Sequence, residues 1–234
     1  MQRQKRRQRI ATPTGKPGRP PRISHKTIAE AALEVGFHKL TMVAVAERLG
    51  VDHSSLYRHV RKRSDLLLAA ADLAILRLEW RDGATHWRPY VETLAVAVWS
   101  LYQRYPGLAD AMRSLDTTPP SAIRGFAEAT AQLQALGFSQ PDAVLVLDSI
   151  MDMTVDSASS WRRMARMDRA GAALARAGDE GPEDSSSLAS RIQAITKVLS
   201  EDPEQWWRRK LALLLDGAEL LLNRTSAQDG RENT

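Results

Sequence analysis

Three hydrogen-bonding side chains, Ser54, Arg58 and Arg61, share one face of a short predicted helix. Leu56 and Val60 lie four residues apart in the same segment, so they share the opposite face. One face can therefore pack against a core while the other faces solvent. A solvent-facing surface of hydroxyl and guanidinium groups is chemically suited to bind a polyanion.

The residues before this segment complete a predicted helix-turn-helix. Thr41 can cap a helix whose apolar positions recur at helical spacing through residue 49, and Asp52 can cap the helix that follows. Gly50 supplies the left-handed turn between them. Ala46 is small where the two helices must cross closely. An ordinary helical hairpin of the core would show the same spacing, so assigning a DNA-binding motif depends on the neighbouring sequence.

The charge of the chain is divided between its two ends. Residues 1–63 hold 15 Lys and Arg against 4 Asp and Glu, a net of +11, whereas the remaining 171 residues hold 18 against 24, a net of −6. Neutralising phosphates with basic side chains releases counterions. A division of this kind is therefore expected when one part of the chain binds a polyanion and the other does not. The basic end is therefore the predicted nucleic-acid end.

The first 22 residues form a predicted disordered arm, because they are basic, contain no acidic residue and are rich in Pro and Gly. The segment Pro17-Gly18-Arg19-Pro20 resembles the core of an AT-hook. That resemblance implies that Arg19 and Arg22 lie in the minor groove of A·T-rich DNA. The alternative is a solvated tail that adds only salt-sensitive, non-specific attraction.

Composition favours an all-α protein, since 43% of the residues are hydrophobic, 6% are aromatic and β-branched runs are few. The chain has no cysteine, which excludes disulfides and thiolate metal sites and fits a reducing cytoplasm. The basic N-terminus is followed by no apolar h-region, and Asp72 interrupts the longest apolar stretch, at 66–76, so neither a signal peptide nor a membrane span is predicted. We therefore expect a cytoplasmic, nucleoid-associated protein.

A further predicted helix precedes the motif, capped by Ser24 and ended by Gly36. These three helices, followed by residues 63–67 opening a long fourth one, resemble the N-terminal domain of the TetR family of transcriptional regulators. The matching motifs are Leu40-Thr41, Ala46-Glu47-Arg48-Leu49-Gly50-Val51 and Leu56-Tyr57-Arg58-His59-Val60. The resemblance implies an all-α fold, with an N-terminal three-helix helix-turn-helix DNA-binding domain and a larger C-terminal helical domain for ligand binding and dimerisation.

The family pattern implies a role for each matching position. Three polar residues at the start of the recognition helix would face base edges in the major groove: His53, Ser54 and Ser55. Arg58 would reach a guanine, Thr41 and Tyr57 would touch the DNA backbone, and Arg63 would hold a phosphate. The whole predicted DNA-binding set is Arg19, Arg22, Thr41, His53, Ser54, Ser55, Tyr57, Arg58, His59 and Arg63.

Two departures from the family pattern limit what can be carried over. Val43 stands where the tetracycline repressor subgroup has a base-reading arginine, so the first helix of the motif is predicted to read less DNA. The link before that helix is also shorter than usual, which leaves the end of the preceding helix open. His59 could instead only pack against the helix that follows, and Tyr57 could belong to the core.

Beyond residue 63 the pattern becomes a series of long amphipathic helices. They are predicted near 64–81, 88–105, 107–114, 121–136, 140–169, 188–200 and 203–223, with an acidic surface loop at 177–187. The predicted organisation is a basic arm at 1–22, a DNA-binding domain at 23–68, a regulatory and dimerisation domain at 69–224 and a disordered tail at 225–234.

The helix predicted at 203–223 has an apolar face wider than one neighbouring helix requires. In the family resembled, this helix and the one near 141–169 pair with those of a second copy, which implies a homodimer. Two recognition helices about 34–36 Å apart then match successive major grooves of a palindromic double-stranded operator. A leucine face buried within a single chain is the alternative.

The resemblance also implies a small-molecule site in the C-terminal domain. Ser114 stands where the tetracycline repressor subgroup has a metal-binding histidine, so no metal and no cofactor are predicted. Apolar and aromatic residues with a few polar anchors are typical of pockets for lipophilic molecules. The predicted ligand contacts are Glu79, Val98, Trp99, Tyr102, Met112, Thr117, Phe126, Asp148 and Met151, with Asp152 and Met153 in a wider set. Each of them also fits a plain helical core.

Together these features predict a repressor that releases its operator when a small lipophilic molecule binds the C-terminal domain. Release requires a ligand that prefers the conformation unable to bind DNA. Two alternatives remain: an architectural DNA-binding protein without an effector, and a regulator controlled by a protein partner. No enzyme activity is predicted, because the sequence has no phosphate-binding Gly-rich loop, thiol, clustered metal ligands or nucleophile elbow.

Overall fold

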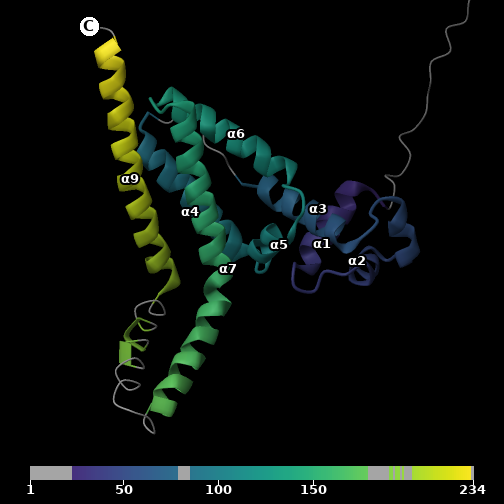
Figure 1. Cartoon of the computed structure of the whole chain (residues 1–234). Coiled ribbons are helices and arrows are strands. Elements are labelled where there is room, and N and C mark those ends of the chain that lie inside the picture. The colour runs from purple at the N-terminus through teal and green to yellow at the C-terminus, as the bar shows by residue number, and fades with distance from the viewer. Residues whose placement is uncertain are drawn as a thin grey trace, which may run out of the picture.

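The computed structural model describes residues 23–78, 85–178, 190–191, 193–195, 197 and 202–232; over 160–178 and 225–232 the description covers the backbone alone. Every regular element in these ranges is a helix, which confirms the predicted all-α class. Figure 1 shows the short N-terminal helices gathered at one end of the molecule and the yellow C-terminal helix at the other.

The N-terminal part begins with α1 (His25–Val35) and α2 (Met42–Leu49). Its predicted caps are present: Ser24 Oγ accepts from the Thr27 N–H at 3.1 Å, and Thr41 Oγ1 accepts from the Ala44 N–H at 3.0 Å. Gly50 has φ 65°, the left-handed turn that the motif requires. The recognition segment η1 (His53–Arg58) is a 3₁₀ helix of six residues, a tighter form that chains use in short pieces.

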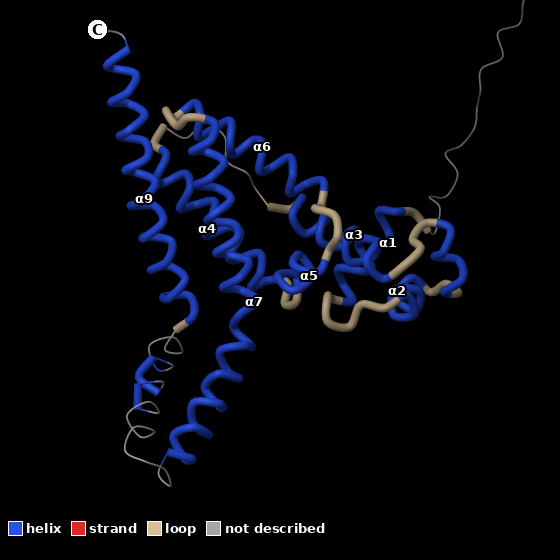
Figure 2. The backbone as a smooth tube through the Cα atoms, in the orientation of Figure 1, coloured by secondary structure: helices blue, strands red, loops and turns tan. Residues whose placement is uncertain are grey.

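The helix α3 (Arg63–Leu76) leads from this part into the long helices. Three elements follow close to their predicted ranges: α4 (Trp87–Arg104), α5 (Leu108–Ser114) and α6 (Pro120–Ala135). The prediction near 64–81 was too long, since α3 ends at Leu76. Figure 2 shows α7 crossing α4, and α7 packs against both α4 and α6.

The last two helices are longer than predicted. The helix α7 (Gln140–Gly178) extends beyond residue 169 to the first residues of the predicted loop, and α9 (Pro203–Glu232) continues through most of the predicted disordered tail. No proline stands between Pro141 and Pro182 or after Pro203, so nothing in the sequence forces either helix to stop earlier. The prediction at 188–200 falls mostly outside the described residues.

The N-terminal core does not end at the N-terminal helices. Its buried side chains include Leu56 and Leu66 together with Leu101 of α4 and Leu108 and Ala111 of α5. His38 and Gly107 also meet at this junction. Gly107 has φ 91°, and a Cβ placed there would lie 2.7 Å from His38 Cε1. The two parts are therefore in direct contact, with no room for a side chain at residue 107.

A second core joins α4, α6, α7 and α9. At its centre Trp99 and Trp207 stack with ring centroids 4.7 Å apart, and Trp207 Nε1 donates to Thr154 Oγ1 at 3.0 Å. Trp207 and Thr154 are both 0% exposed. Since α9 contributes this tryptophan, the last helix belongs to the core of the C-terminal part.

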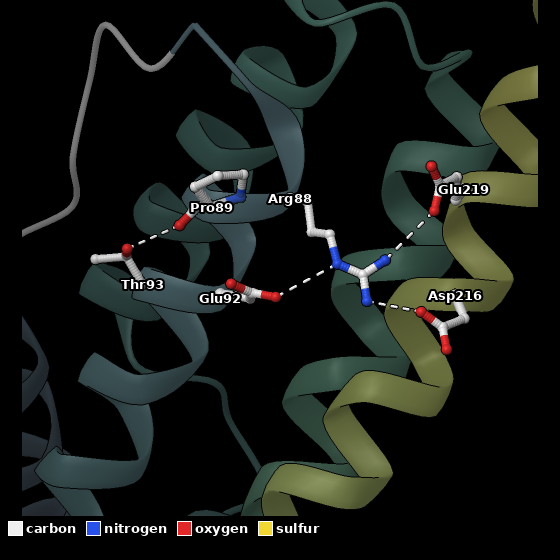
Figure 3. Close-up of polar contacts among 6 residues, drawn as sticks. All are labelled: Arg88, Pro89, Glu92, Thr93, Asp216 and Glu219. Carbon is white, nitrogen blue, oxygen red and sulfur yellow. Dashed lines mark hydrogen bonds and ion pairs between the residues drawn. The ribbon is translucent and has the colours of Figure 1, made fainter.

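An ion-pair cluster holds the start of α4 against α9 (Figure 3). Arg88 lies 2.6 Å from Asp216 and 3.4 Å from Glu219 on α9, and 3.4 Å from Glu92 on its own helix. Its hydrogen bond to Asp216 raises the pKa of Arg88. None of the described helices is long and apolar enough to cross a membrane.

Candidate nucleic-acid interface and effector pocket

The element η1 separates its buried and exposed faces as the sequence predicted. Leu56 is 0% exposed and Val60 is buried, while His53, Ser54 and Arg58 face solvent. Asp52 Oδ1 accepts from the Ser54 N–H at 2.8 Å and so caps the element. Hydrogen bonds from the Ser54 side chain and backbone lower the pKa of Asp52. The exposed hydrogen-bonding side chains His53, Ser54 and Arg58 thus lie on a short element that Asp52 caps at its start.

Two residues with alternative predictions are placed by their contacts. Tyr57 is 53% exposed, so the prediction that it could belong to the core is wrong. Its ring meets the His53 ring edge-on with centroids 6.3 Å apart. The His59 ring meets His25 of α1 edge-on at 5.4 Å. That contact packs His59 against α1 and identifies a neighbour that the sequence did not suggest.

Arg63 makes contacts that the sequence did not reveal. Its Nε donates to the Leu40 carbonyl at 2.8 Å, and its Nη2 donates to the Phe37 carbonyl at 3.5 Å. The guanidinium therefore ties the start of α3 to the link between α1 and α2. The residue as a whole remains exposed. A role in positioning the motif thus accompanies the predicted phosphate contact.

The remaining predicted DNA contacts within the described residues lie at the start of α2 and within η1. Thr41 is exposed at the start of α2, and Ser55 is half-buried within η1. Val43 is 54% exposed, so α2 presents methyl groups at the position where a base-reading donor would stand. Arg19 and Arg22 lie outside the described residues.

A cavity of about 870 Å³ lies among the end of α3 and the helices α4 to α7. Six of the predicted ligand contacts line it: Val98, Tyr102, Met112, Phe126, Asp148 and Met151. Burial raises the pKa of the Tyr102 phenol to about 12. Within the described residues no group of three or more His, Asp or Glu side chains could hold a metal ion.

Two predicted contacts, Trp99 and Thr117, do not line the cavity. Trp99 is 3% exposed and stacks on Trp207, because it follows Val98 by one residue and so points about 100° away around α4. Thr117 is exposed, and its neighbour Thr118 lines the cavity instead. Glu79 lies outside the described residues.

Several lining residues were absent from the predicted set. They come chiefly from α3, α4, α6 and α7: Ile75, Leu78, Leu101, Arg113, Ala122, Ile123, Val155 and Asp156, with Asp152 from the wider set. The α7 members fall at 148, 151, 152, 155 and 156. This helical spacing, counted from Asp148, could have identified Val155 and Asp156 from the sequence.

One hydrogen bond connects the cavity wall to the N-terminal part. The backbone N–H of Ser121, at the start of α6, donates to Asp72 Oδ1 on α3 at 2.7 Å. Helix starts leave N–H groups without intrahelical partners, so this carboxylate caps α6 from another helix. Ile75, three residues later on α3, lines the cavity. The same helix thus bounds the cavity at its end and, through Arg63 at its start, is bonded to the link between α1 and α2.

The chain matches family models along most of its length. Residues 26–70 match the model described as bacterial regulatory proteins, tetR family, and residues 81–222 match the tetracyclin repressor-like C-terminal domain. The tetracycline repressor protein class C of Escherichia coli is 30% identical over 83% of this chain and 88% of that protein. The HTH-type transcriptional repressor DrrR1 of Streptomyces coeruleorubidus is 28% identical over 78% of this chain and 67% of that protein.

Solved structures show the same fold. Apo ActR from Streptomyces coelicolor superposes with a TM-score of 0.70 at 17% identity, over 86% of this chain and 97% of ActR. ActR in complex with actinorhodin gives a TM-score of 0.67 at 19% identity, over 86% and 96%. The two family matches and the identity to the class C repressor establish that this chain belongs to the TetR family of bacterial transcriptional regulators, with a tetracycline repressor-like C-terminal domain.

Proposed function

We propose that this chain is a homodimeric repressor that binds a palindromic operator through the exposed face of η1. It releases the operator when a small lipophilic molecule enters the cavity among α3 to α7. It acts in the cytoplasm, on the nucleoid DNA. Relatives named as repressors and the actinorhodin complex of ActR support this proposal.

The observation that carries the proposal is the shared helix α3. Arg63 at its start bonds to the Leu40 carbonyl beside the motif, and Ile75 at its end lines the cavity. An occupant that displaces the end of α3 would therefore also displace the link before α2, to which Arg63 is bonded, and with it the helix-turn-helix. The displacement releases DNA only if the occupant binds the displaced state more tightly than the DNA-binding state.

Exposed apolar side chains support a dimer built from α7 and α9. On α9, Leu213 is 73% exposed and Leu220 is 61% exposed; on α7, Val144 and Leu145 are exposed as well. Other leucines of α9, such as Leu211 and Leu215, are buried within the chain. The wide apolar face of α9 is thus divided between the core of one chain and a surface that a second copy can cover.

The test is selection of bound duplexes from a random DNA library, followed by titration of the selected duplex and a scrambled one at two salt concentrations. A palindromic consensus whose preference over the scrambled duplex survives at higher salt is expected. If no consensus emerges and both duplexes lose affinity equally with salt, the protein is an architectural DNA-binding protein and the proposal is wrong.

A further inference from the structure

Two carboxylates that line the effector pocket are exposed to solvent and have no protein partner within the described residues. Asp148 and Asp152 lie one turn apart on α7, and both line the cavity. Within the described part of the chain, neither side chain has a hydrogen bond or an ion pair. Like charges four residues apart on a helix repel each other, so this pair is unfavourable for α7 by itself.

The cation nearest to these carboxylates in the pocket wall is already engaged. Arg113 is the sole Lys or Arg among the described lining residues, and its Nη1 lies 2.8 Å from Asp156 Oδ1. Three carboxylates and one guanidinium give the described lining a net charge of −2. Asp148 and Asp152 account for the excess.

The rest of the wall is apolar or aromatic. Val98 and Met151 provide aliphatic surface, while Tyr102 and Phe126 provide aromatic rings, whose faces attract cations. An anion in this cavity would be repelled by the two carboxylates. A neutral occupant would cover them and remove their water without providing a counter-charge. An apolar molecule that carries a positive charge satisfies both parts of the wall.

We propose that the effector is a lipophilic organic cation, such as a protonated amine or a quaternary centre. Its charge lies against Asp148 and Asp152, and its apolar body fills the space beside Val98, Tyr102 and Phe126. This inference rests on the proposed effector-responsive function and adds the charge of the effector.

Three probes of similar shape and different charge test the inference: tetraphenylphosphonium, triphenylphosphine oxide and tetraphenylborate. Each is titrated into the full-length protein by calorimetry, with the wild-type chain and with Asp148→Asn, Asp152→Asn and the double variant. The cation is expected to bind at least about tenfold more tightly than the neutral probe, and tetraphenylborate more weakly than both. The double variant should abolish most of that preference.

A matched control removes a carboxylate elsewhere. Glu128→Gln neutralises an exposed residue of α6 that is not among the residues lining the cavity, so it should leave the preference unchanged. Both substitutions of the double variant relieve repulsion within α7, and circular dichroism should show intact helices. If the cation fails to bind, binds no better than the neutral probe, or keeps its preference in the double variant, the inference is wrong.

Operator binding distinguishes a failure of the charge assignment from a failure of the proposed function. If a neutral probe binds the cavity and releases the selected duplex while the cation does not, the effector-responsive function holds and only the charge assignment fails. If the chain selects no duplex, the proposed function fails whatever the probes do.

Discussion

Arg58 projects from η1 into solvent, whereas Leu56, two residues earlier, is fully buried. If Arg58 donates to one guanine, Arg58→Ala should cost about 1–3 kcal/mol of binding free energy and relax specificity at a single base pair. Fluorescence anisotropy against duplexes substituted at each position would measure this. Arg124→Ala, on α6, is the control for lost positive charge. A uniform loss at all positions would instead assign Arg58 to a phosphate.

Tyr102 provides a spectroscopic signal from the pocket. Burial raises its pKa from 10.0 to about 12, so the protonated phenol is favoured in the folded state. Its contribution to stability is complete below pH 10 and falls as the pH rises towards 12. Alkaline absorbance titration should show a late ionisation that Tyr102→Phe removes. Unfolding the wild type in denaturant should return that ionisation to the ordinary range; a late step that persists in the variant would contradict the assignment.

The sequence predicted which side chains are buried or exposed better than it predicted which residues they contact. The helical period correctly placed Leu56 and Val60 inside and Arg58 outside. It could not decide between Val98 and Trp99, because either neighbour could face the cavity until the position of α9 is known. The bonds of Arg63 to the carbonyls of Leu40 and Phe37 were equally inaccessible, since they join residues more than twenty positions apart.

One carboxylate of α3 accepts a hydrogen bond from the start of α6. Asp72→Ala removes the acceptor of the buried Ser121 N–H and should lower the free energy of unfolding by about 1–3 kcal/mol, the cost of leaving such a donor unpaired. Asp72→Asn keeps an oxygen acceptor and should cost less. Urea denaturation of the three proteins would measure the difference. Equal losses for both variants would show that charge, and not the cap, matters at this position.

The contact between α9 and α7 can be measured by a double-mutant cycle. Thr154→Val leaves the Trp207 N–H buried without an acceptor and should cost about 1–3 kcal/mol of stability, whereas Trp207→Phe removes the donor and keeps a ring for Trp99 to stack on. The double variant should therefore lose less than the sum of the two single losses. Additive losses would argue against the hydrogen bond.

Element boundaries were predicted where the sequence has strong local signals. Ser24, Thr41 and Gly50 mark helix ends by capping or by a positive φ, and the structure places each as expected. The ends of α7 and α9 lack such signals, so both were predicted too short. The 3₁₀ geometry of η1 was also missed, because a segment of six residues is too short for its spacing to distinguish two helix types.

The protein is expected to bind DNA as a homodimer. Leu213→Glu with Leu220→Glu places charges on the exposed face of α9 and should convert the dimer to a monomer. Operator affinity should fall with it, because one recognition element covers only a half-site. Sedimentation velocity and duplex titration would report both effects. Leu76→Glu, an equally exposed leucine on α3, is the control; a dimer that survives the double substitution would place the interface elsewhere.

The composition of the N-terminal core limits how the DNA-binding part of this regulator can be fused to the sensor domain of another protein. Leu101, Leu108 and Ala111 belong to the same buried cluster as Leu56 and Leu66, although they lie on α4 and α5, beyond the DNA-binding motif. A chimaera that fused residues 23–68 to a foreign sensor would carry an open hydrophobic seam where those three side chains belong. The transplantable DNA-reading module is therefore larger than its sequence motif. Either the end of α4 and all of α5 must travel with it, or the recipient must supply apolar groups of matching size at the same three places.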